Sequence, residues 1–481
     1  MRTVRLHGAF LGVASFLFGA LPAAYGDSWM PYRGSVQSDA TGRRYVVLHP
    51  PALGRGAEFL LCEAAPGSPD VVEVWQKDAD AKPGPEIDVR TNDRVVLTGS
   101  LRSAPLHVRV SSAGLGFAAL VEWFDAGHGD SFVWVGADGK TNHVRRIEQL
   151  FTQAEIDGFP KTSSSTMWFR AAWNDDEAKE VVVVGSGGLV RVVSMVTGRV
   201  RAGGDAEVLR GIRLSDPAAR IPAADLLADS RAPGADEALV AVFASPTASA
   251  VARLHAAGSL AKRGDRRGKD LLVALAKTPP PAGVDREDRG YALEHLPFAL
   301  GLDAIPALKD AMRGEPKEGW SEAGTGFVAL GQKATAALVA MLTEPNQSDG
   351  YRAGALRALE RIKDRSALPA LLAAAADPSV FVASSAMDAA IETGGASISK
   401  ELAALLDRNT TQDSRIAAYF REVKEPASVG PLVRALRRSP RSAFSPDYFR
   451  EALSFQTNAA VRHDGSVETW EAWFRGQTKF K

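Results

Sequence analysis

The sequence predicts a multidomain β + α protein, with an antiparallel β-rich domain followed by an array of helices. Three patterns lead to this prediction. Short runs of β-branched and aromatic residues fill residues 27–212. From Leu214 onward, apolar residues recur at steps of three and four, which is the period of an α-helix. In this second region X-Pro pairs return at nearly regular intervals. A chain of 481 residues is also too long for one hydrophobic core.

The N-terminus has the pattern of a secretory signal peptide. Arg2 and Arg5 precede an apolar run at residues 9–21, and small residues follow up to Gly26. The run is shorter than the about 20 apolar residues that span a bilayer. We therefore expect cleavage near Gly26, a periplasmic or secreted mature protein, and no membrane span after signal removal. An uncleaved anchor is the alternative.

Residues 27–212 are expected to form strands joined by tight turns. Gly, Pro, Asp and Asn separate the apolar runs, as they do between antiparallel strands. The predicted strands are Tyr45–Leu48, Phe59–Leu61, Val72–Trp75, Val95–Leu97, Leu106–Val110, Phe132–Val135, Val181–Val184 and Leu189–Val193.

An internal similarity bears on the topology of this domain. Trp123 precedes a polar turn and the strand at residues 132–136, and Trp173 precedes a similar turn and strand at residues 181–185. The two copies are offset by about 50 residues, the length of a propeller blade. A propeller-like domain is therefore expected, with a β-sandwich as the alternative.

Proline punctuates the helical region. Because proline cannot continue a helix but suits the first turn of the next one, a recurring X-Pro pair marks the turn between paired helices. Successive pairs are mostly 29 to 37 residues apart, and Asn409 stands where one proline is missing. The pairs are Ser245-Pro246, Thr278-Pro279, Glu315-Pro316, Glu344-Pro345, Asp377-Pro378 and Ser439-Pro440. Glycines such as Gly264, Gly331 and Gly394-Gly395 are expected to close the second helix of a pair.

One unit carries a family resemblance. The run Tyr351–Leu372 (YRAGALRALERIKDRSALPALL), followed by Asp377-Pro378, resembles the short HEAT-like repeat that also occurs in phycobilin lyase subunits. The resemblance covers about residues 214–438. It implies an α-solenoid over residues 213–444 with a concave surface that binds a protein or peptide, and it implies no bilin chemistry.

The C-terminal residues 445–481 do not form a clean repeat. Trp470 and Trp473 are three residues apart and lie on one face if the segment is helical. We expect helices that cap the apolar end of the array. A partner-docking site is the alternative, because exposed aromatic patches mark interfaces.

Charge and cysteine content exclude several classes of function. There are 57 basic and 57 acidic residues, so the net charge is zero and a nucleic-acid partner is not expected. Cys62 is the single cysteine, which rules out an intramolecular disulfide and a c-type haem site. It lies in an apolar strand, so we expect a buried and unreactive thiol.

The search for catalytic or metal-binding residues is negative. The polar cluster around His128 and Ser131 falls in a predicted turn, and neighbours in sequence rarely converge as a catalytic triad. The G-x-G-x-x-A match at residues 114–119 and the glycines at 185–188 lack the helix of a dinucleotide site. Acidic runs at residues 78–80 and 174–177 depart from the calcium-binding loop pattern and are expected to be solvated turns. No catalytic, cofactor-binding or metal residue is predicted.

Two further motifs have simple structural interpretations. The tripeptide Arg263-Gly264-Asp265 matches an adhesion motif by chance, in a loop between helices. The arginines at 434, 437, 438 and 441 end a helix, where cations complement the helix dipole. An anionic partner remains the alternative for these arginines.

The sequence thus predicts an exported, non-enzymatic scaffold that uses its repeat surface to bind another protein or peptide. The alternative is a carbohydrate-binding or enzymatic β domain with the repeats as a docking platform, because aromatic side chains stack on sugars. Core packing explains the same tryptophans more simply, because large aromatic side chains dominate small β cores. They are Trp29, Trp75, Trp123, Trp134, Trp168 and Trp173.

Overall fold

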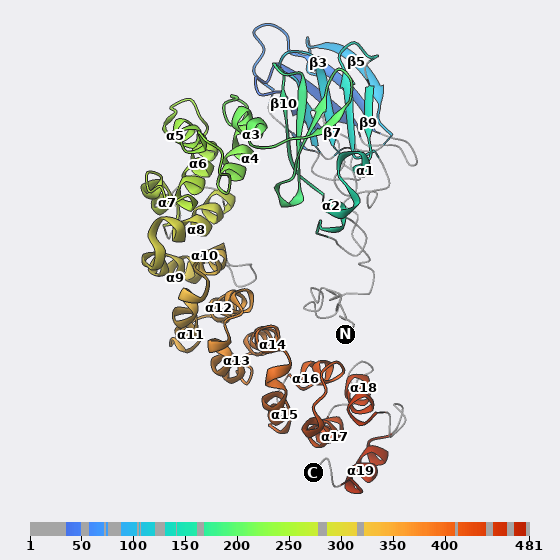
Figure 1. The fold of residues 1–481 in the computed structure, drawn as a ribbon, viewed down its shortest axis with the longest axis vertical. Coiled ribbons are helices and arrows are strands. Elements are labelled where there is room, and N and C mark those ends of the chain that lie inside the picture. The colour runs from blue at the N-terminus through green and yellow to red at the C-terminus, as the bar shows by residue number, and fades with distance from the viewer. Residues whose placement is uncertain are drawn as a thin grey trace, which may run out of the picture. The chain divides into compact units, whose positions relative to one another are not determined.

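The computed structural model divides the chain into two compact units, Met1–Gly204 and Asp205–Lys481 (Figure 1). Helix α3 (Asp205–Gly211) begins directly after the division and ends just before the sequence-based boundary at Ile212. The expected signal segment, residues 1–26, lies outside the described residues. The described residues are 35–49, 57–71, 74–75, 88–102, 105, 107–120, 130–140, 142–160, 168–277, 286–314, 322–408, 412–438, 446–458 and 466–477.

Strands of the first unit form three antiparallel sheets. Their strand orders are β4-β1-β2-β3-β5, β6-β7-β8-β9 and β10-β11-β12-β13, which we call the first, second and third sheets. Each segment predicted as a strand contains one, so the antiparallel β-rich prediction is confirmed. The strands are β1 (Ser35–Ser38), β2 (Arg44–His49), β3 (Glu58–Glu63), β4 (Val74–Trp75), β5 (Arg94–Ser100), β6 (His107–Val110), β7 (Gly116–Leu120), β8 (Phe132–Gly136), β9 (Asn142–Arg145), β10 (Phe169–Asp175), β11 (Glu180–Gly185), β12 (Val190–Ser194) and β13 (Val200–Ala202). Two short helices, α1 (Ile147–Leu150) and α2 (Gln153–Asp157), follow the second sheet.

The second sheet is buried on both faces because it lies between the other two. Along β8, Trp134 belongs to a core shared with Val183 of the third sheet. The adjacent Val133 belongs to a separate core shared with Phe59 of the first sheet. Successive side chains of a strand point to opposite faces, so a strand between two sheets must be apolar throughout. This explains why β7 and β8 are continuous apolar runs.

Polar side chains connect the three sheets to one another. The Oε1 atom of Gln37 in β1, which is almost fully buried, accepts a hydrogen bond from the backbone N–H of Val108 in β6 (2.7 Å). Arg109 of β6 donates to the carbonyl of Ala172 in β10 (2.8 Å), and Asn174 of β10 donates back to the carbonyl of Arg109 (3.0 Å). These bonds fix the spacing of the sheets where β1, β6 and β10 meet.

The internal similarity in the sequence does not mark equivalent strands. Residues 132–136 form β8, the third strand of the second sheet, whereas residues 181–185 belong to β11, the second strand of the third sheet. Trp123 lies outside the described residues. Both strands are almost wholly buried, so the shared apolar pattern reflects equal burial and not equal position.

The second unit consists of helices that pack in two rows in chain order (Figure 1). The even-numbered row contains α4 (Pro217–Leu227), α6 (Ala250–Lys262), α8 (Arg286–Leu300), α10 (Glu322–Leu330), α12 (Asp349–Ile362), α14 (Val380–Gly394), α16 (Asp413–Phe420) and α18 (Pro446–Thr457). The odd-numbered row contains α5 (Ala235–Ala244), α7 (Lys269–Leu275), α9 (Ile305–Gly314), α11 (Thr335–Thr343), α13 (Leu368–Ala374), α15 (Ser399–Asp407), α17 (Val429–Arg438) and α19 (Val467–Arg475). The predicted helical second half is therefore confirmed.

Each helix packs against its neighbours one or two places along the chain. Among the even-numbered helices, α4, α6, α8, α10 and α12 each pack against the next one. Helices α14 and α16 are joined by Arg415 of α16, which donates to the carbonyl of Ser384 in α14 (3.0 Å). Helix α16 then packs against α18. The odd-numbered helices lie against adjacent even-numbered ones, as α11 does against α12 and α13 against α14. One hydrophobic core, from Leu254 to Trp470, runs through these contacts.

Two kinds of turn alternate along the helical unit: proline turns follow odd-numbered helices, and glycine turns follow even-numbered helices. The described X-Pro pairs, at residues 245–246, 344–345 and 377–378, lie between an odd-numbered helix and the following even-numbered helix. The pairs at 278–279, 315–316 and 439–440, and Asn409, lie outside the described residues. Four even-numbered helices end at a glycine with positive φ, which is 87° at Gly264, 61° at Gly301, 60° at Gly331 and 53° at Gly395. After α12 the corresponding residue with positive φ is Lys363, with φ of 54°.

Hydroxyl–carboxylate bonds join successive units. Thr335, at the start of α11, donates to Asp364 in the turn before α13 (2.7 Å). Ser399, at the start of α15, donates in the same way to Glu425 before α17 (2.9 Å). Two such bonds at equivalent places indicate that the units stack in a common register.

The end of the core is covered by α19. Trp470 is fully buried and Trp473 packs against the same core, with their ring centroids 6.0 Å apart in a T-shaped arrangement. Helix α19 rests on α17, where Phe474 approaches Gly430. Trp470 therefore contributes to folding and is not available to a partner.

One stretch of the described residues, Ala323–Thr343, has the length and hydropathy of a membrane span. Gly331, with φ of 60°, divides it into α10 and α11. Phe327 of α10 and Leu338 of α11 are fully buried in the common core. Packing inside the unit thus accounts for these two apolar side chains.

The left-handed Lys363 leads to a prediction about stability. Replacing Lys363 by glycine should raise the free energy of unfolding by about 0.5–1 kcal/mol, because a Cβ atom is unfavourable at this φ. The ion pair that Lys363 makes with Glu392 joins two half-exposed side chains and contributes little. Urea unfolding of the full chain, followed by far-ultraviolet circular dichroism, measures the change.

The matched control is Gly331→Ala, at a similar φ. It should lower the free energy of unfolding by about 1 kcal/mol. A Lys363→Gly variant that unfolds at lower urea than the wild type would contradict the argument.

Candidate binding surface of the helical unit

Motifs noted in the β unit serve as turns and strands. Gly114 lies in the turn between β6 and β7, and Gly116 begins β7, where a Cβ atom would sit 2.0 Å from the carbonyl oxygen of Val135. The chain continues as β7 and not as the helix of a dinucleotide site. Gly187 and Gly188 likewise turn the chain from β11 into β12.

The acidic run at residues 174–177 ends β10 and enters the following turn, and Asp175 is buried rather than solvated as the sequence predicted. Asp175 accepts from the N–H of Ala178 (3.1 Å), and Asp176 accepts from the hydroxyl of Ser112 (2.9 Å). Residues 78–80 and His128 lie outside the described residues, and Ser131 is buried at the start of β8. Within the described ranges no group of three or more His, Cys, Asp or Glu side chains is placed to hold a metal ion.

Three of the β-unit tryptophans are core residues. Trp134, Trp168 and Trp173 are each 2% exposed or less, so none of them offers a ring face to a sugar. Trp29, Trp123 and the side chain of Trp75 lie outside the described part of the structure. Cys62 is fully buried, and burial raises the pKa of its thiol to about 11, so the thiol is protonated and unreactive.

The adhesion-like tripeptide braces two helices. Arg263 donates to the carbonyl of Leu227 at the end of α4 (2.8 Å) and pairs with Asp236 of α5. Gly264 provides the left-handed turn after α6, and Asp265 pairs with Arg267. The motif is therefore part of the packing between units.

The C-terminal arginines are paired within the chain. Arg434 makes two hydrogen bonds to Asp407 (2.8 and 3.0 Å), Arg437 pairs with Glu471 (3.3 Å), and Arg438 pairs with Asp413 (3.2 Å). Arg441 lies outside the described residues. These contacts join α17 to its neighbours, so the described part of this cluster is engaged inside the unit.

The even-numbered helices offer a different kind of surface. We call their solvent-exposed side chains the even-row face. On α8, α14 and α18 it includes exposed aromatic or acidic side chains, such as Phe298, Glu392 and Phe455. Other helices contribute charged groups that reach across to a neighbour, as Arg415 of α16 does to Asp388 of α14 (3.1 Å).

A polar stack crosses the first part of the even-row face. Asp225 of α4 accepts a hydrogen bond from the hydroxyl of Tyr291 in α8 (2.9 Å) and lies 2.8 Å from Nδ1 of His255 in α6. The Tyr291 ring lies between two histidines, with centroids 3.9 Å from His255 and 4.0 Å from His295. Gly258 makes room for this ring, since a Cβ atom there would lie 2.5 Å from it.

Burial sets the protonation states in this stack. It raises the pKa of Tyr291, an effect that the Asp225 carboxylate reinforces. It lowers the pKa of His295, while the carboxylates of Glu294 and Asp225 act in the opposite direction. The neutral imidazole is therefore favoured in the folded protein. A sequence signal existed for this stack, because Asp225, His255 and Tyr291 are spaced close to the repeat length.

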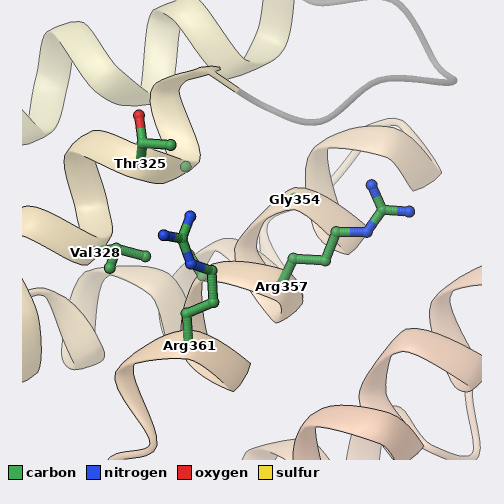
Figure 2. Close-up of a pocket in the computed structure, with 7 residues that line it drawn as sticks. Thr325, Val328, Gly354, Arg357 and Arg361 are labelled. Atoms are coloured by element: carbon green, nitrogen blue, oxygen red, sulfur yellow. The ribbon is translucent and has the colours of Figure 1, made fainter. Parts of the chain in front are cut away.

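Further along the face, a small recess lies between α10 and α12. It has a volume of about 20 Å³, room for one water-sized group, and Gly324 and Gly354 form part of its wall. Figure 2 shows Arg361 reaching from α12 toward Thr325 and Val328 of α10, whereas the guanidinium of Arg357 points the other way. Arg357 also lies over the ring of Phe381 in α14, 5.7 Å from its centroid.

Comparisons with known proteins give only distant structural matches. No family model matches the chain, and no curated protein matches it. Among solved structures, the complex of CpcE and CpcF of phycocyanin lyase from Nostoc aligns with 53% of this chain and 96% of its own, at 16% identity and a TM-score of 0.27. Human deoxyhypusine hydroxylase aligns with 53% of this chain and 96% of its own, at 19% identity and a TM-score of 0.23. A structure from a study of the interaction between cadherin and beta-catenin aligns with 56% of this chain and 63% of its own, at 16% identity and a TM-score of 0.22. Scores this low do not establish a shared fold.

The stack predicts a pH dependence of stability. Because the folded state lowers the pKa of His295, the unfolded chain binds a proton more readily, and stability should fall as pH falls below about 6.5. His295→Phe keeps an aromatic ring in the stack and removes the titrating group. This variant should lose less stability than the wild type between about pH 7.5 and pH 5.5.

Tyr291→Phe is the control for this experiment. It removes the hydrogen bond to Asp225 and should cost about 1 kcal/mol at every pH, without changing the slope. Urea unfolding at several pH values measures both quantities. Equal slopes for the wild type and His295→Phe would show that His295 does not couple protonation to folding.

Proposed function

We propose that this chain is an exported, non-enzymatic scaffold whose helical unit is an α-solenoid of HEAT-like repeats and binds another protein or peptide along its even-row face. The observation that carries the proposal is the packing of helices in chain order around one core that extends from Leu254 to Trp470. In such an array each unit contacts only its neighbours, so its outward side chains add up to an extended surface. The turn pattern of proline and left-handed glycine supports the assignment to repeats.

The β unit has a supporting role in this proposal. Three antiparallel sheets that follow one another along the chain, with the second packed on both faces, favour a propeller-like arrangement over a two-sheet sandwich. Burial of Trp134, Trp168 and Trp173 weighs against the alternative function, a carbohydrate-binding β domain.

Site-specific crosslinking tests the binding surface. A photoreactive amino acid placed at Phe298, Glu392 or Phe455, all exposed on even-numbered helices, should give adducts with one and the same partner protein in the intact envelope. The matched controls are Ala336, Ala340 and Ala373, exposed on odd-numbered helices. Adducts that are equally frequent from both rows, or absent from the even row, would refute binding on this face.

Export has a separate test. The pattern of residues 1–26 supports cleavage near Gly26. The intact mass of the protein from the envelope or medium of cells should correspond to a chain that begins close to Asp27. Arg2→Glu together with Arg5→Glu should reduce export. A full-length mass in the cytoplasmic fraction would contradict this part of the proposal.

A further inference from the structure

A cavity of about 390 Å³ lies at the start of the helical unit, between the end of α3, α4 and α5 (Figure 1). The residues of α5 that line it recur at steps of three and four, so the cavity follows one face of this helix from Gly234 to Ser245. Arg213, which follows α3, and Arg220 of α4 line it as well. Residues 205–277, which include the whole lining, are all described. The volume lies in the range of about 300–1,000 Å³ that is usual for small-molecule sites.

Arg220 lines this cavity without a counter-ion. Its Nε atom is buried and has no hydrogen-bond partner, and none of the described residues forms an ion pair with its guanidinium group. Arg213, whose side chain is exposed, also has no ion pair or side-chain hydrogen bond with a described residue. Buried donors are rarely left unpaired, because losing their hydrogen bonds to water costs free energy. Arg220 therefore requires an acceptor from outside the chain.

A later hairpin shows which contacts an arginine at this position makes elsewhere in the array. Residues 217–246 and 349–378 align without a gap, since each stretch begins with the first residue of an even-numbered helix and ends with the proline of an X-Pro pair. Arg220 is the fourth residue of α4, and Arg352 is the fourth residue of α12. The two arginines thus occupy equivalent positions.

The carboxylates that pair with the later arginine are missing from the first hairpin. Arg352 pairs with Asp349 (2.7 Å) and with Asp377. The residues aligned with these two are Pro217 and Ser245, and neither of them has a carboxylate. Ser245 lines the same cavity as the unpaired arginine.

The turn at Ser245 otherwise matches the turn at Asp377. One carboxylate oxygen of Asp377 accepts from the N–H of Ser379 (2.9 Å), and the other contacts Arg352. The single side-chain oxygen of Ser245 contacts the N–H (3.3 Å) and the hydroxyl (3.0 Å) of Thr247. Only the oxygen that would receive the arginine therefore has no counterpart in the first hairpin.

We propose that the cavity binds a small monocarboxylic acid, whose carboxylate pairs with Arg220 as the side chain of Asp377 pairs with Arg352. A guanidinium group binds a carboxylate through two parallel N–H···O bonds. Ile212 and Val242, both buried, give the lining an apolar part that suits the hydrocarbon body of such an acid. This site is additional to partner binding on the even-row face and does not depend on it.

The charges of the lining favour a ligand with one negative charge. Arg213 and Arg220 are its two cations, and Glu237 is its one anion, so one positive charge is in excess. A monocarboxylate balances this charge. A second carboxylate on the ligand would extend along α5 toward Glu237 and be repelled.

Isothermal titration calorimetry on the full mature chain tests the proposal. The probes are hexanoate and 4-phenylbutyrate, each compared with its neutral amide, together with adipate as the dicarboxylate that matches hexanoate. We expect saturable binding of the two monocarboxylates and about tenfold weaker binding of the amides, as for the loss of one charged contact. Adipate should bind more weakly than hexanoate.

Variants connect the bound carboxylate to this cavity. Arg220→Gln should weaken the acids about tenfold and abolish the difference between acid and amide, because both changes remove the same contact. Arg220→Lys should retain part of the affinity. Arg253→Gln is the matched control, since Arg253 is the fourth residue of α6, exposed and outside the lining, and it should leave binding unchanged.

Ser245→Asp tests the same contact from the other side. It restores the carboxylate that Asp377 provides in the later hairpin, so it should abolish acid binding and raise the midpoint of thermal unfolding by about 2 °C. Ser245→Asn, which has a similar shape and no charge, should do neither. Circular dichroism verifies the fold of each variant.

Several results would overturn the carboxylate site. These are no binding of either acid at concentrations up to about 10 mM, equal affinity for acid and amide, and equal affinity of the wild type and Ser245→Asp for the acids. Tighter binding of hexyl phosphate than of hexanoate would overturn the assignment to carboxylic acids. Crosslinks from the even-row face do not depend on these results, so the proposed function fails or holds separately.

Discussion

A helical hairpin in this chain cannot bury its apolar side alone, and the rest of the second unit depends on this constraint. Each even-numbered helix is covered by a partner from the odd row and by even-numbered neighbours. Close approach between helices is possible where glycine replaces a larger residue. At Gly326 a Cβ atom would lie 2.6 Å from the carbonyl oxygen of Leu293 on the preceding even-numbered helix. Because burial proceeds from neighbour to neighbour, the core is continuous and one side of the even row is left for solvent.

Polar contacts between units give this apolar stacking a register. Two acidic residues that precede a proline, Glu344 and Asp377, make such contacts between units. Glu344 accepts a hydrogen bond from Tyr351 of the next helix (2.9 Å) and pairs with Arg313 of α9 (3.1 Å). Asp377 pairs with Arg352 and also accepts from the N–H of Ser379 at the start of α14 (2.9 Å). Each such bond contributes only about 1 kcal/mol, but its direction excludes alternative alignments of the helices.

The elements were predictable because their determinants are local. Strand runs such as Phe132–Val135 and helix boundaries at Asp377-Pro378 follow from periodicity and from the backbone limits of proline. Lys363 was not predictable as a left-handed residue, since lysine rarely adopts that backbone and the surrounding packing decides. The similar patterns around Trp123 and Trp173 do not correspond to equivalent strand positions, because a sequence pattern reflects burial and not strand order.

The convergence of side chains at the recess between α10 and α12 could not be predicted from the sequence. Thr325 and Arg361 come from different helices, and only the packing of α10 against α12 brings them to one recess. Near the C-terminus, α17 pairs Arg434 with Asp407 of α15 and Arg438 with Asp413 of α16, although these arginines were the stronger candidates for an anionic partner in the sequence. A cluster of like charges in a sequence thus indicates little until the positions of the opposite charges are known.

The burial of Cys62 has a practical consequence. It is the one thiol of the chain and lies in the core of the first sheet. Because burial shields the thiol and raises its pKa, it should not react with maleimide or methanethiosulfonate reagents at neutral pH. Cysteines introduced at exposed sites of the helical unit can therefore be labelled selectively in an otherwise natural chain. Pairs of spin labels or fluorophores on successive repeats would then report how much the array bends or twists in solution.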